Sequence, residues 1–212
     1  SALLISILSI HALHAKTYQI DPEHSQVAFN VRHLVSRANG VFNEFSGQIQ
    51  FDPAQPEQIQ VEAAIAVSSV DTDNEKRDEH LRSPDFFDVK SFPFITFKST
   101  GAKVQDDVIH VMGDFTMHGV TKSIVLPVTV LGTGANPWTK KEQVGMSAKT
   151  VLNRSEYGVN SWTDVASETS ATLSLSSRWV PVSREETDAE GTSRRWRGGR
   201  RSHSTPRPHG RR

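Results

Sequence analysis

The chain has 212 residues, no cysteine, and 24 Lys plus Arg against 24 Asp plus Glu, so it can form one large domain or two small ones. The lack of cysteine excludes a disulfide framework, a thiolate metal site and a cysteine nucleophile. The charge is uneven, because residues 183–212 carry nine Arg against four acids. The body is therefore mildly acidic, which is not typical of a nucleic-acid-binding domain.

Residues 1–15 have the features of a signal peptide that is truncated at its start. Residues 2–10 are apolar apart from Ser6 and Ser9, and Ala15 offers a small residue at the cleavage position. The apolar run is shorter than the roughly 20 residues that span a bilayer. An ordinary buried first strand or helix is the alternative. On the signal-peptide interpretation the mature protein is exported.

From residue 17 to about 180, apolar and polar residues alternate with a period of two, which predicts half-buried antiparallel strands. We expect eight or nine strands, within residues 17–20, 25–32, 47–51, 58–67, 95–99, 108–117, 123–132, 143–150 and 170–180. Turn-forming pairs such as Asp106-Asp107 and His118-Gly119 separate them. Such strands form a sandwich or a closed barrel, and about eight strands enclose room for side chains or one small ligand.

One charged stretch breaks the alternation. Thr72 and Glu75 have the spacing of a capping box, which predicts a short helix over 73–82. A second turn of helix is expected over 84–88, and another small helix is an option over 33–40.

The periodicity stops after Pro181, which predicts three regions along the chain. These are the signal peptide, a β-barrel domain over 16–182, and a disordered Arg-rich tail over 183–212. The tail either binds anionic lipid or nucleic acid, or is an incidental extension.

The polar residues give little support for catalysis. The histidines before residue 182 show neither HxH nor HExxH spacing, and there is no GxSxG elbow. Asp21, His24 and Ser25 lie close in sequence, but Asp and Ser are common turn formers and such neighbours rarely form a triad. We therefore predict no catalytic residue, no metal site and no cofactor.

The inward-facing strand positions are apolar, without charge or amide. A ligand enclosed by them would be a long hydrocarbon, whereas a sugar or nucleotide would need convergent polar groups. A solid barrel, in which the side chains fill one another's space, fits the periodicity equally well. The candidate lining residues are Val27, Phe29, Val31, Phe42, Phe45, Ala63, Ile65, Val67, Phe86, Phe87, Phe92, Ile95, Phe97, Phe115, Met117, Leu126, Val128, Met146 and Ala148.

Four segments carry a family resemblance. They are residues 20–52, "DEHLRSPDFFDVKSFPFITFKST" (78–100), "GDFTMHGVTKSIVLPVTVLG" (113–132) and "LNRSEYGVNSW" (152–162). In this order they resemble the YceI-like family of bacterial exported proteins over about 17–178. The resemblance implies an all-β fold, an antiparallel eight-stranded lipocalin-like barrel with one or two short helices covering an end. It also implies a periplasmic or secreted protein that is not an enzyme.

The resemblance further implies an exported carrier or sequestering protein. Its ligand would be a polyisoprenoid, of isoprenoid-quinone or polyprenyl type, or another long-chain lipid. The alternative is a solid-core barrel that serves as a protein-interaction or stress-response module without lipid. Homodimer formation and transient contact with a membrane are both compatible with the sequence, and we expect no specific binding of nucleic acid. Arg82 and Arg154 match motif positions of the family. We expect these two arginines to be structural tethers or to lie near the polar end of the ligand.

Overall fold

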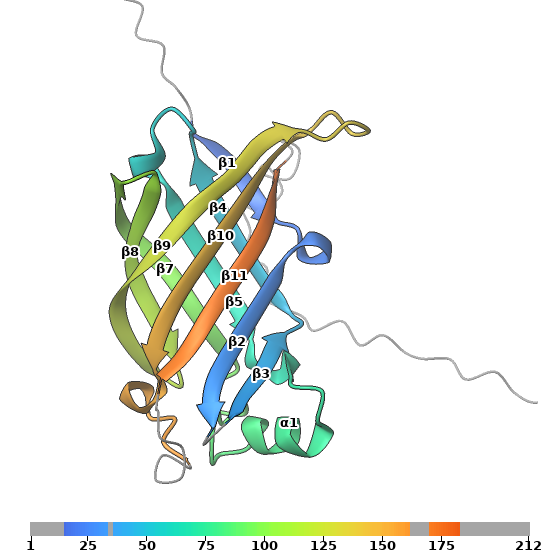
Figure 1. Cartoon of the computed structure of the whole chain (residues 1–212), viewed down its shortest axis with the longest axis vertical. Coiled ribbons are helices and arrows are strands. Elements are labelled where there is room, and N and C mark those ends of the chain that lie inside the picture. Colours follow the sequence, from blue (N-terminus) through green and yellow to red (C-terminus); the bar gives the residue numbers. More distant parts are fainter. Residues whose placement is uncertain (1–14, 34–35, 162–169, 183–212) are drawn as a thin grey trace, which may run out of the picture. The chain divides into compact units, whose positions relative to one another are not determined.

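A computed structural model describes residues 15–33, 36–161 and 170–182. Almost all of the predicted signal peptide (1–14) and the predicted tail (183–212) lie outside these residues. The strands are β1 (Lys16–Ile20), β2 (Gln26–His33), β3 (Ser36–Phe42), β4 (Phe45–Phe51), β5 (Gln60–Ala66), β6 (Val70–Asp71), β7 (Phe94–Gln105), β8 (Val108–Met117), β9 (Val120–Ala135), β10 (Glu142–Asn153) and β11 (Ser170–Pro181). One α-helix, α1 (Glu75–Arg82), lies at one end of the strands (Figure 1). In the part of the chain described, no helix is long and apolar enough to cross a membrane.

The eleven strands occupy eight positions around a closed antiparallel barrel. β1 and β2 both pair with β11, so with the 3-10 turn η1 (Pro22–His24) they form one interrupted strand. β4 pairs with β1 and β3 pairs with β2, so β4 and β3 together fill the next position. β5 pairs with β4 and β6 pairs with β3, so β5 and β6 together fill the position after that. β7 to β11 follow in chain order, and β11 returns to β1. The predicted eight-stranded barrel is confirmed.

Two hairpin turns follow the sequence expectation. Asp106 and Asp107 between β7 and β8 have φ of 51° and 61°, and His118 and Gly119 between β8 and β9 have φ of 50° and 75°. Two successive positive φ values give the turn twist that suits the twist of paired strands. A Cβ on Gly119 would lie 2.5 Å from Cε1 of Phe92, so the turn also needs glycine for close packing.

The expected helix over 73–82 forms as α1, but a different residue caps it. The side chain of Asn74 accepts a hydrogen bond from the backbone N–H of Arg77 (3.1 Å), which is the N-cap interaction. Thr72, expected as the cap, instead donates its backbone N–H (3.0 Å) and its hydroxyl to Oδ1 of Asp78. Asp78 is buried, with 6% of its surface exposed.

Two other predicted helical segments are not helices. Residues 84–88 form consecutive turns, in which the N–H groups of Phe86 and Asp88 both donate to the carbonyl of Ser83 (3.1 and 2.9 Å). The described part of 33–40 is strand, ending β2 and beginning β3. A Cβ on Gly40 would lie 2.4 Å from Cζ of Phe29, so this inward position must be small. The missing apolar alternation of β3 follows from that crowding.

The barrel interior is packed at the end opposite α1. Ile49, Phe51, Val111 and Val144 are fully buried there, together with Trp179 at the end of β11. The interior is hollow near α1, where β2, β8 and β10 end. The candidate site therefore lies inside the barrel at the α1 end.

Candidate ligand-binding cavity

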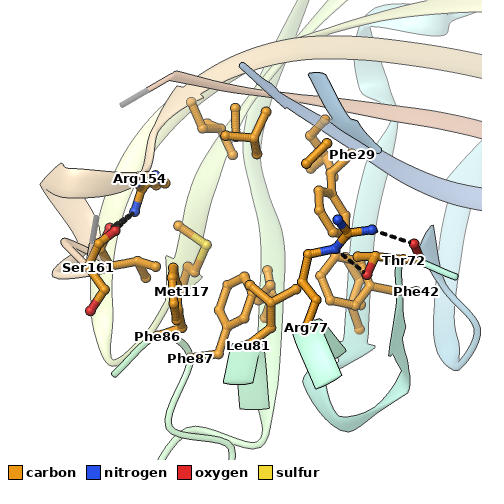
Figure 2. A pocket seen from close by; sticks show the side chains of 18 of the residues that line it. Phe29, Phe42, Thr72, Arg77, Leu81, Phe86, Phe87, Met117, Arg154 and Ser161 are labelled. Atoms are coloured by element: carbon orange, nitrogen blue, oxygen red, sulfur yellow. Dashed lines mark hydrogen bonds between the residues drawn. The ribbon is translucent and has the colours of Figure 1, made fainter. Parts of the chain in front are cut away.

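A cavity of about 350 Å³ lies inside the α1 end of the barrel (Figure 2). Strands β2, β3, β5, β7, β8, β10 and β11 form its walls, α1 and the turns after it close one side, and the segment after β10 closes another. The lining residues are Phe29, Val31, Arg32, Ala38, Phe42, Ile65, Thr72, Arg77, His80, Leu81, Phe86, Phe87, Ile95, Phe115, Met117, Leu152, Arg154, Val159, Ser161, Ala171 and Leu173. The volume is within the roughly 300–1,000 Å³ typical of small-molecule sites.

A smaller cavity of about 80 Å³ lies next to the first, toward the packed end. Four residues border both cavities: Ile65, Ile95, Phe115 and Leu173. The remaining walls are mostly apolar and include Val27, Phe45, Ala63, Leu126 and Trp179. The two cavities therefore follow one another along the interior, with four apolar side chains between them.

The structure brings fifteen of the nineteen predicted lining residues to these two cavities. They are Val27, Phe29, Val31, Phe42, Phe45, Ala63, Ile65, Phe86, Phe87, Ile95, Phe97, Phe115, Met117, Leu126 and Ala148. Phe86 and Phe87 come from the turns after α1 and lie at its side of the larger cavity (Figure 2). The alternation of apolar and polar residues along the strands thus indicated which of these side chains face the barrel interior.

Four predicted lining residues border neither cavity. Val128 and Met146 do point inward, but they are buried in the packed end (6% and 3% exposed). Phe92 packs on the β8–β9 turn, with its ring centroid 4.6 Å from that of His118. Val67 begins the 3-10 turn η3 (Val67–Ser69), and its N–H donates to the carbonyl of Pro93 (3.0 Å). These residues stabilise the fold around the cavity.

Strand reasoning missed the polar part of the lining, because most of it comes from the helix and from loops, with Arg32 near the end of β2 as the exception. Thr72 and Arg77 contribute from the start of α1, and Arg154 and Ser161 from the segment after β10. The expectation of a lining without polar groups is wrong at this end of the barrel. For Arg154, the match to a family motif was the one available signal.

Arg154 opens the 3-10 turn η4 (Arg154–Tyr157), directly after β10. Its Nη1 donates to the backbone carbonyls of Val159 (2.7 Å) and Ser161 (3.0 Å) (Figure 2). Its Nε is buried without a hydrogen-bond partner among the described residues. Arg154 is only 9% exposed, and burial lowers the pKa of its guanidinium. The side chain holds the loop and is also part of the cavity wall.

Arg77 lies on the other side of the cavity from Arg154 (Figure 2). Its Nε donates to Oγ1 of Thr72 and its Nη2 to the carbonyl of Thr72, both at 2.7 Å. Arg82, the other motif arginine, is a structural tether. It donates to the carbonyls of Ser68 (2.8 Å) and Val70 (2.7 Å) and does not border the cavity.

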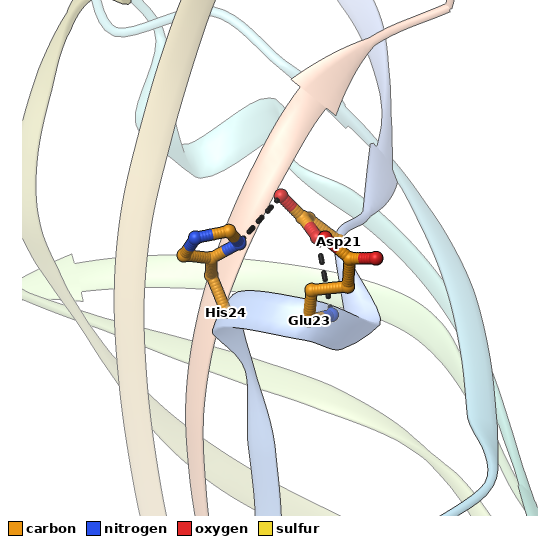
Figure 3. Close-up of side chains that lie close together, drawn as sticks. All are labelled: Asp21, Glu23 and His24. Atoms are coloured by element: carbon orange, nitrogen blue, oxygen red, sulfur yellow. Dashed lines mark hydrogen bonds and ion pairs between the residues drawn. The ribbon is translucent and has the colours of Figure 1, made fainter.

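Asp21, Glu23 and His24 bring three ligating atoms within 4.8 Å of one another at the β1–β2 corner (Figure 3). Asp21 accepts hydrogen bonds from the N–H of Glu23 (3.1 Å) and from Nε of Arg178 (2.8 Å). Burial acts to raise the pKa of Asp21, but hydrogen bonds from Arg178 and His24 outweigh it and lower the pKa. The cluster is a structural corner that joins β1 and β2 to β11.

An antiparallel barrel with one packed end and an apolar cavity at the other has room inside for one small-molecule ligand. The YceI-like domain family matches residues 18–178, and this chain belongs to that family.

Named relatives and solved structures support the assignment. A UPF0312 protein of Pseudomonas putida is 37% identical over 162 residues, covering 74% of this chain and 84% of its own length. Protein YceI of Salmonella arizonae is 36% identical over 148 residues, covering 68% and 77%. The Campylobacter jejuni YCEI protein has a TM-score of 0.63 at 28% identity, covering 72% of this chain and 91% of its own. Burkholderia cenocepacia BcnA shares the fold, with a TM-score of 0.69 at 24% identity over 75% and 98% of the two chains.

Proposed function

We propose that this protein binds a long-chain lipid, of polyisoprenoid or fatty type, inside its barrel and carries or sequesters it. The observation that supports this function best is the apolar pair of cavities along the barrel interior. A structure from Saccharophagus degradans described as a polyisoprenoid binding domain has the same fold, with a TM-score of 0.58 at 16% identity over 78% of this chain and 98% of its own.

The energetics favour a hydrocarbon ligand. Burying hydrocarbon gains about 0.8 kcal/mol per methylene, so about ten methylenes gain about 8 kcal/mol before the chain is ordered. Ordering a flexible chain costs part of this gain. The apolar strand positions offer no directional contacts along the tail, so this site would select weakly for chain structure. We therefore propose that the protein binds this ligand and does not catalyse a reaction on it.

Export to the periplasm is a further part of this proposal. It is supported by the apolar segment at residues 2–10 and by the family resemblance. A lipid carrier in that compartment would move or hold hydrocarbon chains that water does not dissolve.

Mass spectrometry of the bound material tests this function. The full chain is purified gently from a bacterial host, and native spectra are compared with spectra of an organic extract. We expect a single long-chain lipid at up to one molecule per barrel. A protein that is consistently empty, and that takes up no lipid when incubated with vesicles, would favour the solid-core alternative.

A further inference from the structure

The positive charge of Arg154 has no acidic partner among the described residues. The residue is nine-tenths buried, and this burial lowers the pKa of its guanidinium. Its hydrogen bonds go to the neutral carbonyls of Val159 and Ser161, and Nε has no partner in the described chain. An arginine keeps its charge at any ordinary pH, and an uncompensated buried charge is unfavourable.

The charged residues that border the larger cavity all carry basic side chains. Arg32, Arg77 and Arg154 contribute guanidinium groups, His80 contributes an imidazole, and the described lining contains no Asp or Glu. Asp78 accepts hydrogen bonds from Thr72, and the exposed carboxylate of Asp85 lies 3.3 Å from Nε2 of His80, so His80 has an acidic neighbour whereas Arg154 has none among the described residues. The cavity therefore combines a long apolar interior with a positive end.

Arg154 is better placed than Arg77 to compensate an anion. Arg77 is exposed to water, and its Nε and Nη2 both donate to Thr72. Water already stabilises that charge, so an anion gains little from it. Arg154 is only 9% exposed and is largely shielded from water, so an anion beside it gains more from the same charge.

We propose that Arg154 binds the anionic headgroup of the lipid, so that the ligand is a long-chain acid. This inference rests on the proposed function and narrows it to hydrocarbons that end in a carboxylate or a phosphate. Guanidinium groups recognise both anions by charge and by planar hydrogen bonding. The headgroup then lies beside the segment after β10, and the tail extends past Phe115 toward the smaller cavity.

Matched acid and alcohol ligands test this assignment. The full chain is stripped of lipid, and each ligand competes with the neutral fluorescent probe N-phenyl-1-naphthylamine at neutral pH, below its critical micelle concentration. One pair is oleate and oleyl alcohol, and the other is geranylgeranyl monophosphate and geranylgeraniol. We expect the acid of at least one pair to bind at least tenfold more tightly than its alcohol. A preference in the first pair alone indicates fatty acids, and one in the second alone indicates prenyl phosphates.

Variants then locate the preference. Arg154→Gln should weaken acid binding about tenfold and change alcohol binding less than threefold. Arg37→Gln is the matched control, because it removes a charge from an exposed arginine on β3 that does not border the cavity. Arg154→Lys keeps a positive charge and should keep part of the preference.

The outcomes separate this inference from the proposed function. If acids and alcohols bind equally to the unaltered protein, the headgroup assignment is wrong while lipid binding stands, whether or not a variant folds. If Arg154→Gln keeps the full preference, or Arg77→Gln abolishes it instead, a different group binds the anion. If no ligand displaces the probe, both proposals fail.

Discussion

Asp78 is a buried carboxylate that organises the start of α1. Its Oδ1 accepts from both the N–H and the hydroxyl of Thr72, and Thr72 in turn accepts two hydrogen bonds from Arg77. This chain of three residues fixes Arg77 at the cavity wall. Figure 2 shows the bonds between Arg77 and Thr72. A buried network of this kind is stabilising only while each polar group has its partner.

Replacing Asp78 should therefore destabilise the protein far more than replacing its neighbour. Asp78→Ala leaves the N–H and hydroxyl of Thr72 without their acceptor, which we expect to cost about 1–3 kcal/mol in the free energy of unfolding. Glu79→Ala, at the next position of α1, removes an exposed acid and should stay within about 0.5 kcal/mol. Urea unfolding measures both. Equal effects would show that the network around Thr72 adds no net stability.

The corner between β1 and β2 is the element where the barrel changes partners. β1 pairs with β4, and β2 pairs with β3, while β11 runs along both. The side chain of Asp21 caps the 3-10 turn at this corner and binds Arg178 of β11. A hydrogen-bonded ion pair thus fixes the closing strand where the ladder is interrupted.

This corner should make stability depend on acid pH. The pKa of Asp21 is lowered in the folded protein, so the folded state releases this proton more readily than the unfolded chain does. Its contribution is present above the unfolded-state pKa of about 4 and is lost as pH falls through the lower folded-state pKa. Asp21→Asn should lose about 1–2 kcal/mol at pH 7. Unfolding at pH 7 and near pH 2 should show the two proteins converging at low pH, and a constant difference would contradict the assignment.

Strands were predictable where alternation and turn signals agree. β8 has the predicted bounds, 108–117, because strict alternation is followed by a turn that needs Gly119. β3 was missed because the inward position of Gly40 must be small beside Phe29, which removes the apolar signal. The tertiary partner that imposes this limit cannot be read from the segment itself.

The cavity was predictable from the same alternation, but its polar end was not. A side chain on a strand has its direction fixed by the period of two, so positions such as Phe29 and Phe115 could be placed inward. Arg77 and Arg154 lie on a helix and a 3-10 turn, whose positions depend on how they pack against the barrel. Which interior positions stay hollow is also a tertiary property, as Val128 and Met146 illustrate.

At the scale of the whole molecule, the barrel interior has a packed hydrophobic core at one end and the candidate ligand-binding cavity at the other. Large side chains such as Phe51 and Trp179 fill the end opposite α1, and they stabilise the closed sheet without any ligand. We therefore expect that the α1 end can keep a cavity and that the fold does not depend on filling it. This division predicts that the two ends respond differently to added volume.

Ala171 offers a direct test of that division. It lies on β11 opposite Leu152, and both line the larger cavity. The indole introduced by Ala171→Trp should fill space that the hydrocarbon tail of the ligand would occupy. Lipid retention should therefore fall at least tenfold. The free energy of unfolding should change by less than about 1.5 kcal/mol, because the indole enters a cavity instead of a filled core.

The matched control for Ala171→Trp is Val151→Trp. Val151 lies next to Leu152 on β10, is 63% exposed, and faces outward because one step along a strand reverses the face. It should change neither lipid retention nor stability. Lipid is quantified by mass spectrometry of organic extracts, and stability by urea unfolding. If the region is solid in solution, Ala171→Trp will instead destabilise the fold by about 1–3 kcal/mol or more through overpacking, with no lipid to lose. Equal effects of the two variants would mean that the register between β10 and β11 differs from the one described.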